Sequence, residues 1–242
     1  MISRRPLLIM SVAKIGLLAA PRRSLAQQGH RIVKLALLGD SIFDNAAYVS
    51  AGDDVTSHVN QRLAGEGGTV LLAQDGAVIS DVPNQLAAMP RNVTHIALSV
   101  GGNDALRHID ILAKPVQSVA QALAAVGDVQ EAFATRYTSM LDTVLKTGLP
   151  TMICTIYDVR LPDDTQRRAG NLALSVLNDV ILRQATSRRL PVLDLRVIFS
   201  EAEDYANAIE PSGQGAAKIA QVIARIAGAH DFSGASSLYR ND

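Results

Sequence analysis

A serine preceded by an aspartate follows the first strongly apolar run of the folded part of the chain. The run Arg31–Leu38 ends in Gly39-Asp40-Ser41. A short, β-compatible run stopped by a glycine predicts a buried strand. Open α/β sheets bind their ligands just past the carboxyl ends of their strands, so the Ser41 hydroxyl is placed to meet a ligand. The alternative is an ordinary turn in which Asp40 and Ser41 only hydrogen-bond to nearby backbone.

Three further segments place glycine, amide or carboxylate groups after apolar runs or before the last predicted helix. They are Gln74-Asp75-Gly76, Gly101-Gly102-Asn103-Asp104 and Asn207-Ala208-Ile209-Glu210-Pro211. Because the carboxyl ends of parallel strands meet at one edge of a sheet, these groups are expected to converge on Ser41. The ordinary alternatives are a tight turn at Gly76, a turn-capping amide at Asn103 and a solvated acid at Glu210 near the last helix's N-terminus.

The elements that would bring these groups together alternate along the chain. Short apolar runs predict five strands, at Ile32–Leu38, Thr69–Ala73, His95–Val100, Thr151–Ile156 and Val192–Leu195. Amphipathic stretches predict helices at Asp54–Ala64, Val82–Ala88, Val116–Lys146, Asp164–Arg188 and Gly215–Ala227. We expect the third stretch to form two helices broken near Gly127-Asp128, because an uncapped helix longer than about 25 residues is unusual. The alternation predicts an α/β fold with helices on both faces of a parallel sheet.

With these motifs in this order and spacing, the chain from Ile32 to Ala227 resembles the SGNH/GDSL hydrolase family of serine esterases and lipases. That family has a serine in a Gly-Asp-Ser block, a glycine after the second strand and an asparagine in Gly-x-Asn-Asp. Its last block, Asp-x-x-His-Pro, precedes the final helix. The resemblance implies a three-layer α/β/α fold with a five-stranded parallel sheet in flavodoxin-like order, and hydrolysis of a carboxylic ester.

The family's roles carry over onto the matching residues. The resemblance implies that Ser41 attacks an acyl carbonyl, giving a tetrahedral oxyanion and then an acyl-enzyme. The oxyanion hole would consist of the backbone N–H groups of Ser41 and Gly76 and the side-chain amide of Asn103, each donor being worth about 3 kcal/mol. Asp40 is expected to fix the turn by accepting hydrogen bonds from backbone. The implied substrate is a small acyl ester or an O-acetyl group on a sugar.

The last block departs from the family pattern, because Asn207 and Glu210 stand where the family has Asp and His. Pro211 follows directly and keeps the frame. In one interpretation Glu210 is itself the base, with its pKa raised by burial and with Asn207 or a backbone group orienting it. In a second, His108, five residues after Asn103, supplies the imidazole. In a third, the protein binds an acyl or acetylated ligand with little or no turnover.

The composition limits the partners of the chain. Its 242 residues are 48% hydrophobic and 19% charged, which suits one globular domain with a full core. The formal net charge of zero argues against nucleic acid as a partner. The single cysteine, Cys154, excludes an internal disulfide and is expected to be buried. Neither metal-ligand spacing nor a glycine-rich phosphate loop is found, so we expect no metal and no cofactor, only a small-molecule ester as partner.

The first 26 residues differ from the rest of the chain. They carry the pair Arg4-Arg5, an apolar stretch and no acidic residue. This order predicts a twin-arginine-like export signal over residues 1–26, and hence a periplasmic or secreted protein; the alternative is an extension on a cytoplasmic enzyme. We expect no stable membrane span in the mature chain. A single domain is expected over 27–229, followed by a flexible tail over 230–242, which is rich in Ser, Gly and Asn.

Overall fold

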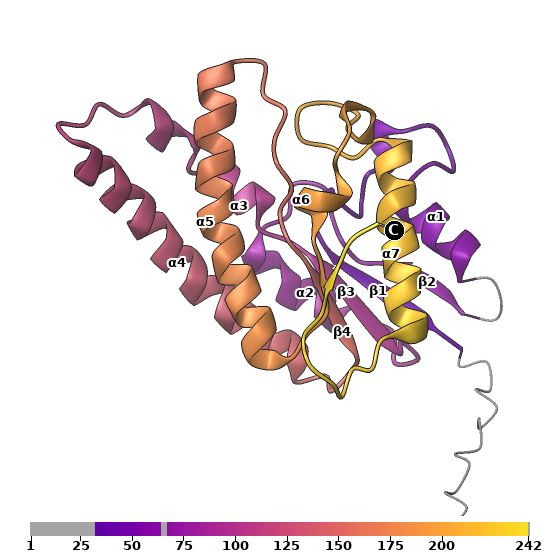
Figure 1. Cartoon of the computed structure of the whole chain (residues 1–242). Coiled ribbons are helices and arrows are strands. Elements are labelled where there is room, and N and C mark those ends of the chain that lie inside the picture. The colour runs from indigo at the N-terminus through magenta and orange to yellow at the C-terminus, as the bar shows by residue number, and fades with distance from the viewer. Residues whose placement is uncertain (1–31, 64–66, 242) are drawn as a thin grey trace, which may run out of the picture. The chain divides into compact units, whose positions relative to one another are not determined.

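The computed structural model describes residues 32–63 and 67–241, so the predicted export signal at 1–26 lies outside the described residues. A parallel sheet lies between two layers of helices (Figure 1). The strands are β1 (Lys34–Gly39), β2 (Gly68–Leu71), β3 (His95–Ser99), β4 (Thr151–Cys154), β5 (Val192–Leu193) and β6 (Leu238–Tyr239). The helices are α1 (Val55–Arg62), α2 (Val82–Ala87), α3 (Gly102–Leu106), α4 (Val119–Leu145), α5 (Asp164–Arg188), α6 (Leu195–Ile198) and α7 (Gly213–Ala229).

The strand order across the sheet is β2-β1-β3-β4-β5-β6, with every neighbouring pair parallel. This confirms the α/β fold, and the first five strands have the flavodoxin-like order. The predicted number of five strands is wrong, because the chain end adds β6 beside β5. The backbone N–H groups of Val192 and Asp194 donate to the carbonyls of Ser237 and Tyr239, at 2.8 and 2.9 Å. This two-residue strand lies in the tail for which composition predicts flexibility, and it is too short to give an alternating pattern.

The predicted helices are found with small shifts in their ends, except that Val116–Lys146 forms one helix and not two. Helix α4 runs for 27 residues without a break at Gly127. A glycine inside a helix costs about 1 kcal/mol relative to alanine. Helix α4 offsets this cost because Ser118 caps its N-terminus and its second half buries large side chains such as Phe133 and Tyr137.

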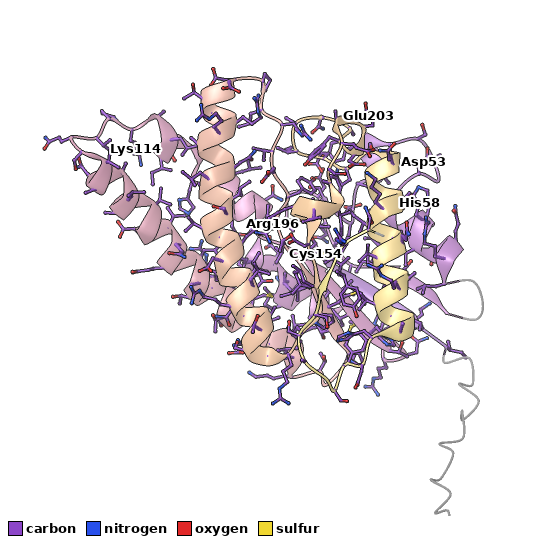
Figure 2. The ribbon with its side chains drawn as sticks, in the orientation of Figure 1. Asp53, His58, Lys114, Cys154, Arg196 and Glu203 are labelled. Carbon is purple, nitrogen blue, oxygen red and sulfur yellow. The ribbon has the colours of Figure 1, made fainter. Side chains whose placement is uncertain are left out.

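Alternate residues of the central strands pack into two separate apolar layers. On β1, Leu35 and Leu37 pack with α1 and α7, whereas Ala36 and Leu38 pack with α2, α4 and α5. This is the two-residue period of a strand covered on both faces. Cys154, labelled in Figure 2, lies at the end of β4 in the first layer, and burial raises the pKa of its thiol. The sheet therefore holds the carboxyl ends of β1 and β3 rigidly beside each other.

Candidate active site

Ser41 follows β1 on a turn that only glycine can make at position 39. Gly39 has φ +126°, and a Cβ there would lie 1.7 Å from the carbonyl oxygen of Ser99 on β3. This close approach lets the Asp40 N–H donate to the same carbonyl at 3.1 Å. The Asp40 carboxyl group accepts a hydrogen bond from the Ile42 N–H at 3.2 Å, the backbone contact expected from the sequence. The backbone that carries the Ser41 side chain is therefore held in place at the carboxyl end of β1.

Gln85 of α2 holds the same turn from the other side. Its side-chain amide donates to the Gly39 carbonyl, and its amide oxygen accepts from the Gly39 N–H, both at 2.8 Å. Gln85 is buried, so these two bonds satisfy groups that water does not reach. The turn that carries Ser41 is thus tied to β3 by backbone and to α2 by a side chain.

Ser41 and Glu210 meet although 169 residues separate them. The Ser41 hydroxyl donates a hydrogen bond to Glu210 Oε1, with an Oγ–Oε1 distance of 3.1 Å. Glu210 is only 5% exposed, so it is not a solvated acid, and it precedes α7, whose N-cap is Ser212. Among the described residues, its second oxygen, Oε2, has no hydrogen-bond partner. The arrangement is that of a hydroxyl beside a buried proton acceptor.

The segment that carries Glu210 is held at several points. Asn207 accepts hydrogen bonds from the N–H groups of Ile209 and Glu210, at 2.9 and 3.0 Å, and so orients the backbone of Glu210 and not its carboxylate. The buried Tyr157 hydroxyl donates to the Ile209 carbonyl at 2.6 Å. Asn45, from the loop after Ser41, donates to the Pro211 carbonyl at 3.3 Å.

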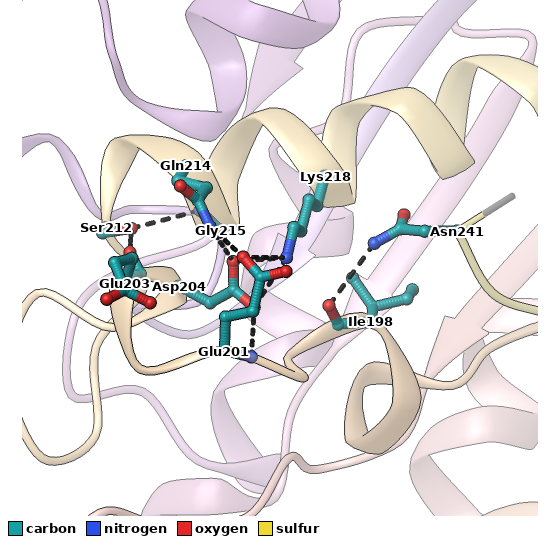
Figure 3. A network of polar contacts seen from close by, with 9 residues as sticks. All are labelled: Ile198, Glu201, Glu203, Asp204, Ser212, Gln214, Gly215, Lys218 and Asn241. Atoms are coloured by element: carbon teal, nitrogen blue, oxygen red, sulfur yellow. Dashed lines mark hydrogen bonds and ion pairs between the residues drawn. The ribbon is translucent and has the colours of Figure 1, made fainter.

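An ion pair at the start of α7 anchors the same segment (Figure 3). Lys218 Nζ lies 2.7 Å from Oδ1 of Asp204, which is fully buried. The Asp204 carbonyl accepts from the Ser212 N–H at 2.9 Å, and Tyr205 and Pro211 form an antiparallel bridge. Both ends of the segment are therefore fixed, and Glu210 lies between them.

Burial raises the pKa of two carboxyl groups at Ser41. Desolvation raises the pKa of Glu210 from 4.5 to about 7, against the opposing effect of the hydrogen bond from Ser41. Desolvation raises the pKa of Asp40 from 3.8 to about 8, opposed by the Ile42 N–H and increased by the charges of Glu210 and Asp104. Glu210 is thus about half ionised at neutral pH, whereas Asp40 is mainly protonated.

Two of the predicted oxyanion donors follow neighbouring strands: Gly76 lies in the turn after β2, and Asn103 lies in α3, directly after β3. The Asn103 side-chain amide uses one N–H to donate to the Ala77 carbonyl at 3.0 Å, and its nitrogen carries a second. Asn103 and Ser41 line the same pocket. Gly76 has φ +76°, with open space where a Cβ would lie, so its backbone conformation and not crowding favours glycine there. Gly76 does not line that pocket but immediately precedes Ala77, which Asn103 binds.

His108 lines the same pocket as Ser41 and Glu210. Within residues 32–63 and 67–241, no hydrogen bond joins its ring to Ser41. The geometry therefore pairs the Ser41 hydroxyl with a carboxylate and leaves His108 elsewhere on the pocket wall. In the same ranges, no cluster of His, Cys, Asp or Glu could hold a metal ion, and no helix is long and apolar enough to cross a membrane.

Sequence reasoning missed three residues that hold the site together: Gln85, Asn45 and Tyr157. Gln85 lies three residues after Val82 on the buried face of α2, so a polar residue on an apolar helical face was the available signal. Asn45 and Tyr157 bond to backbone groups far away in the sequence, and no local pattern indicates such partners.

Comparison with known proteins gives one family. A sequence profile of the GDSL-like lipase/acylhydrolase family matches residues 37–218, which include Ser41, Asn103 and Glu210. No curated protein matches the chain.

Solved structures of several ester hydrolases have a similar fold. A lipase from a goat rumen metagenome has a TM-score of 0.62 and 17% identity, and the match covers 83% of this chain and 99% of that one. Phospholipase A1 from Streptomyces albidoflavus has a TM-score of 0.56 and 19% identity, with 77% and 96% covered. An acetyl xylan esterase has a TM-score of 0.58 and 15% identity, with 78% and 96% covered. At these identities the likeness shows the fold.

Proposed function

Because the chain belongs to the GDSL-like lipase/acylhydrolase family, we propose that it hydrolyses carboxylic esters through Ser41, with Glu210 as the base. The observation that carries the proposal is the hydrogen bond from the Ser41 hydroxyl to the buried Glu210 carboxylate. A carboxylate of ordinary pKa is a weak base for a serine, but burial raises the pKa of Glu210 to about 7, near neutral pH.

In the proposed reaction, Glu210 takes the hydroxyl proton as Ser41 Oγ forms a bond to the ester carbonyl carbon. The electron pair of the carbonyl moves onto its oxygen, and Asn103 Nδ2 and the N–H groups of Ser41 and Gly76 are the proposed donors to that oxyanion. The tetrahedral intermediate then loses the alcohol, which receives the proton from Glu210. A water molecule then gives a proton to Glu210 as its oxygen forms a bond to the acyl carbon. The second intermediate breaks its bond to Ser41 Oγ, which takes the proton back from Glu210, and the acid is released.

Labelling with a fluorophosphonate probe, together with hydrolysis of p-nitrophenyl acetate, tests the proposal. We expect the wild-type protein to be labelled, Ser41→Ala to lose labelling, and Glu210→Gln to lose 10²–10⁴-fold in rate, the typical contribution of a general base. A labelled wild type whose rate depends on His108 and not on Glu210 would move the base to the imidazole. If the wild type is neither labelled nor active, the proposed function is wrong. The result would then favour the alternative that this fold binds an acyl or acetylated ligand without turnover.

A further inference from the structure

The pocket that contains Ser41 extends away from the sheet between two long helices. From the Ser41–Glu210 pair it passes α3 and the 3₁₀ turn Ile109–Ala113 and continues between α4 and α5. Its volume is about 110 Å³. Figure 1 shows α4 and α5 diverging toward the end at which their N-termini lie, and Lys114, labelled in Figure 2, lies just before that end of α4.

The far part of this pocket is apolar. Its walls include Val126 and Val129 from α4, Leu174 and Leu177 from α5, and Leu106 and Ile111 from the segment between β3 and α4. Among the described residues that line the pocket, the acidic ones are confined to Asp40 and Glu210 beside Ser41, and the basic ones to the imidazole of His108. A sugar placed between α4 and α5 would leave its hydroxyls without partners, which is costly.

Small residues on α5 make room in the pocket. Gly170 and Ala173 are three positions apart, so they lie on one face of the helix, and both line the pocket. A Cβ at position 170 would meet Val159 at 3.7 Å, an ordinary contact, so neither crowding nor backbone strain explains the glycine. Larger side chains at these positions would fill the space beside Val126 and Val129.

We propose that this pocket binds the acyl chain of the substrate, and that the substrate is an ester of a medium- or long-chain fatty acid. The inference rests on the proposed function for its chemistry and narrows that function to one class of ester. An acetyl group would leave most of the apolar wall uncovered. Each methylene that the wall buries is worth about a fourfold gain in binding. Gly170 and Ala173 then determine how long a chain the site accepts.

The first test compares p-nitrophenyl esters from acetate to dodecanoate. We expect kcat/KM to rise at least tenfold from acetate to octanoate, and Ala173→Phe to lower the octanoate-to-acetate ratio at least tenfold. Leu172→Phe is the matched control, because this neighbouring side chain is 67% exposed and leaves the pocket unchanged. If Ala173→Phe does not fold, Val126→Phe replaces it in the test, because it puts a phenyl ring into the pocket from α4 and should lower the same ratio. A flat or falling chain-length profile, or equal losses on both esters, would overturn the inference.

The second test separates the pocket from the chemistry. Calorimetry with 1-octanol and 1-butanol on Ser41→Ala protein measures chain binding without any reaction. We expect octanol to bind at least tenfold more tightly than butanol, and Ala173→Phe to remove that difference. If the wild type is not labelled by fluorophosphonate but octanol binds as expected, the proposed function fails and the apolar-chain site stands. If labelling succeeds and octanol shows no preference, the chain site fails and the hydrolase stands.

Discussion

At the scale of single residues, two buried carboxyl groups line the pocket that contains the Ser41 hydroxyl. Asp40 precedes Ser41 in the chain, and Glu210 accepts its hydrogen bond. Both pKa values are raised by burial, but the pKa of Glu210 lies near 7 and that of Asp40 near 8. The charge of Glu210 itself raises the pKa of Asp40, so ionisation of Glu210 favours the neutral form of Asp40. The group that accepts the hydrogen bond from Ser41 is therefore the proposed proton acceptor, and Asp40 is its neutral neighbour.

The activity should depend on the ionisation of Glu210. Because only the carboxylate can accept the Ser41 proton, we expect kcat/KM to rise with pH through about 7 and to level off above it. Initial rates on p-nitrophenyl acetate between pH 5 and pH 9 measure this limb. A limb near the ordinary carboxyl value of 4.5 would contradict the role of burial.

Stability should show the opposite dependence on pH. The pKa of Asp40 is higher in the folded protein than in the unfolded chain, so the folded state binds the proton more tightly. The resulting contribution is fully present below about pH 4 and is lost as pH rises through about 8. In the wild type we expect the unfolding free energy to fall by an amount on the order of a few kcal/mol between these two pH values because of Asp40. In Asp40→Asn this part of the fall should be absent, as urea unfolding at each pH would measure. A wild-type slope that the variant retains would assign the decrease to other groups.

At the scale of elements, the site depends on turns and helix packing more than on strand content. The sequence was sufficient to predict the strands, because their apolar runs are short and are bounded by glycine or polar residues. The topology of the sheet also led us to expect that Glu210 lies near Ser41, as their hydrogen bond shows, but the choice between Glu210 and His108 as the base was left open by the sequence. The sixth strand and the unbroken α4 were missed, because both depend on tertiary contacts that outweigh local composition. The partners of Gln85 and Asn45 were missed for the same reason.

Two glycines should respond in opposite directions to the same substitution. Gly39→Ala places a Cβ 1.7 Å from the Ser99 carbonyl at positive φ, so we expect a loss of more than about 3 kcal/mol of unfolding free energy. Gly127→Ala adds a methyl group in open space within α4, so we expect a gain of about 1 kcal/mol. Chemical denaturation measures both. A gain at position 39 would contradict the described turn.

At the scale of the whole molecule, the last residues complete the sheet. Strand β6 covers the edge of β5, and Asn241 donates a hydrogen bond to the Ile198 carbonyl at 3.3 Å. His230 and the Tyr239 hydroxyl lie 2.8 Å apart. The tail thus contributes backbone and side-chain contacts to the sheet whose strand β1 precedes Ser41.

Removal of residues 230–242 should therefore destabilise the folded domain. The deletion exposes the β5 edge and removes several hydrogen bonds, each worth about 1 kcal/mol, so we expect a loss of at least about 2 kcal/mol. Thermal and urea unfolding of the truncated and full chains measure the difference. Equal stabilities would show that the tail contributes nothing to the fold in solution.

The N-terminal segment gives a further prediction at this scale. We propose that residues 1–26 direct export and are removed, since the pair Arg4-Arg5 precedes an apolar stretch that ends in small residues. Mass spectrometry of the protein recovered from its native host should then give an N-terminus at Gln27. An intact N-terminus in the cytoplasmic fraction would contradict export, and Arg4→Lys with Arg5→Lys provides a matched test of the arginine pair.

Gln85 has a mechanical consequence for the nucleophile. Its side-chain amide bonds both the N–H and the carbonyl of Gly39, as the backbone of a neighbouring strand would do. The hydrogen bonding of the sheet is thus extended, at the last residue of β1, to a side chain of α2. If α2 moves, Gln85 therefore moves the turn at Gly39 that precedes Ser41, although Gln85 contacts no reacting atom. The position of the Ser41 hydroxyl therefore depends on how a six-residue helix outside the pocket packs on the sheet, as well as on the backbone bond from Asp40 to β3.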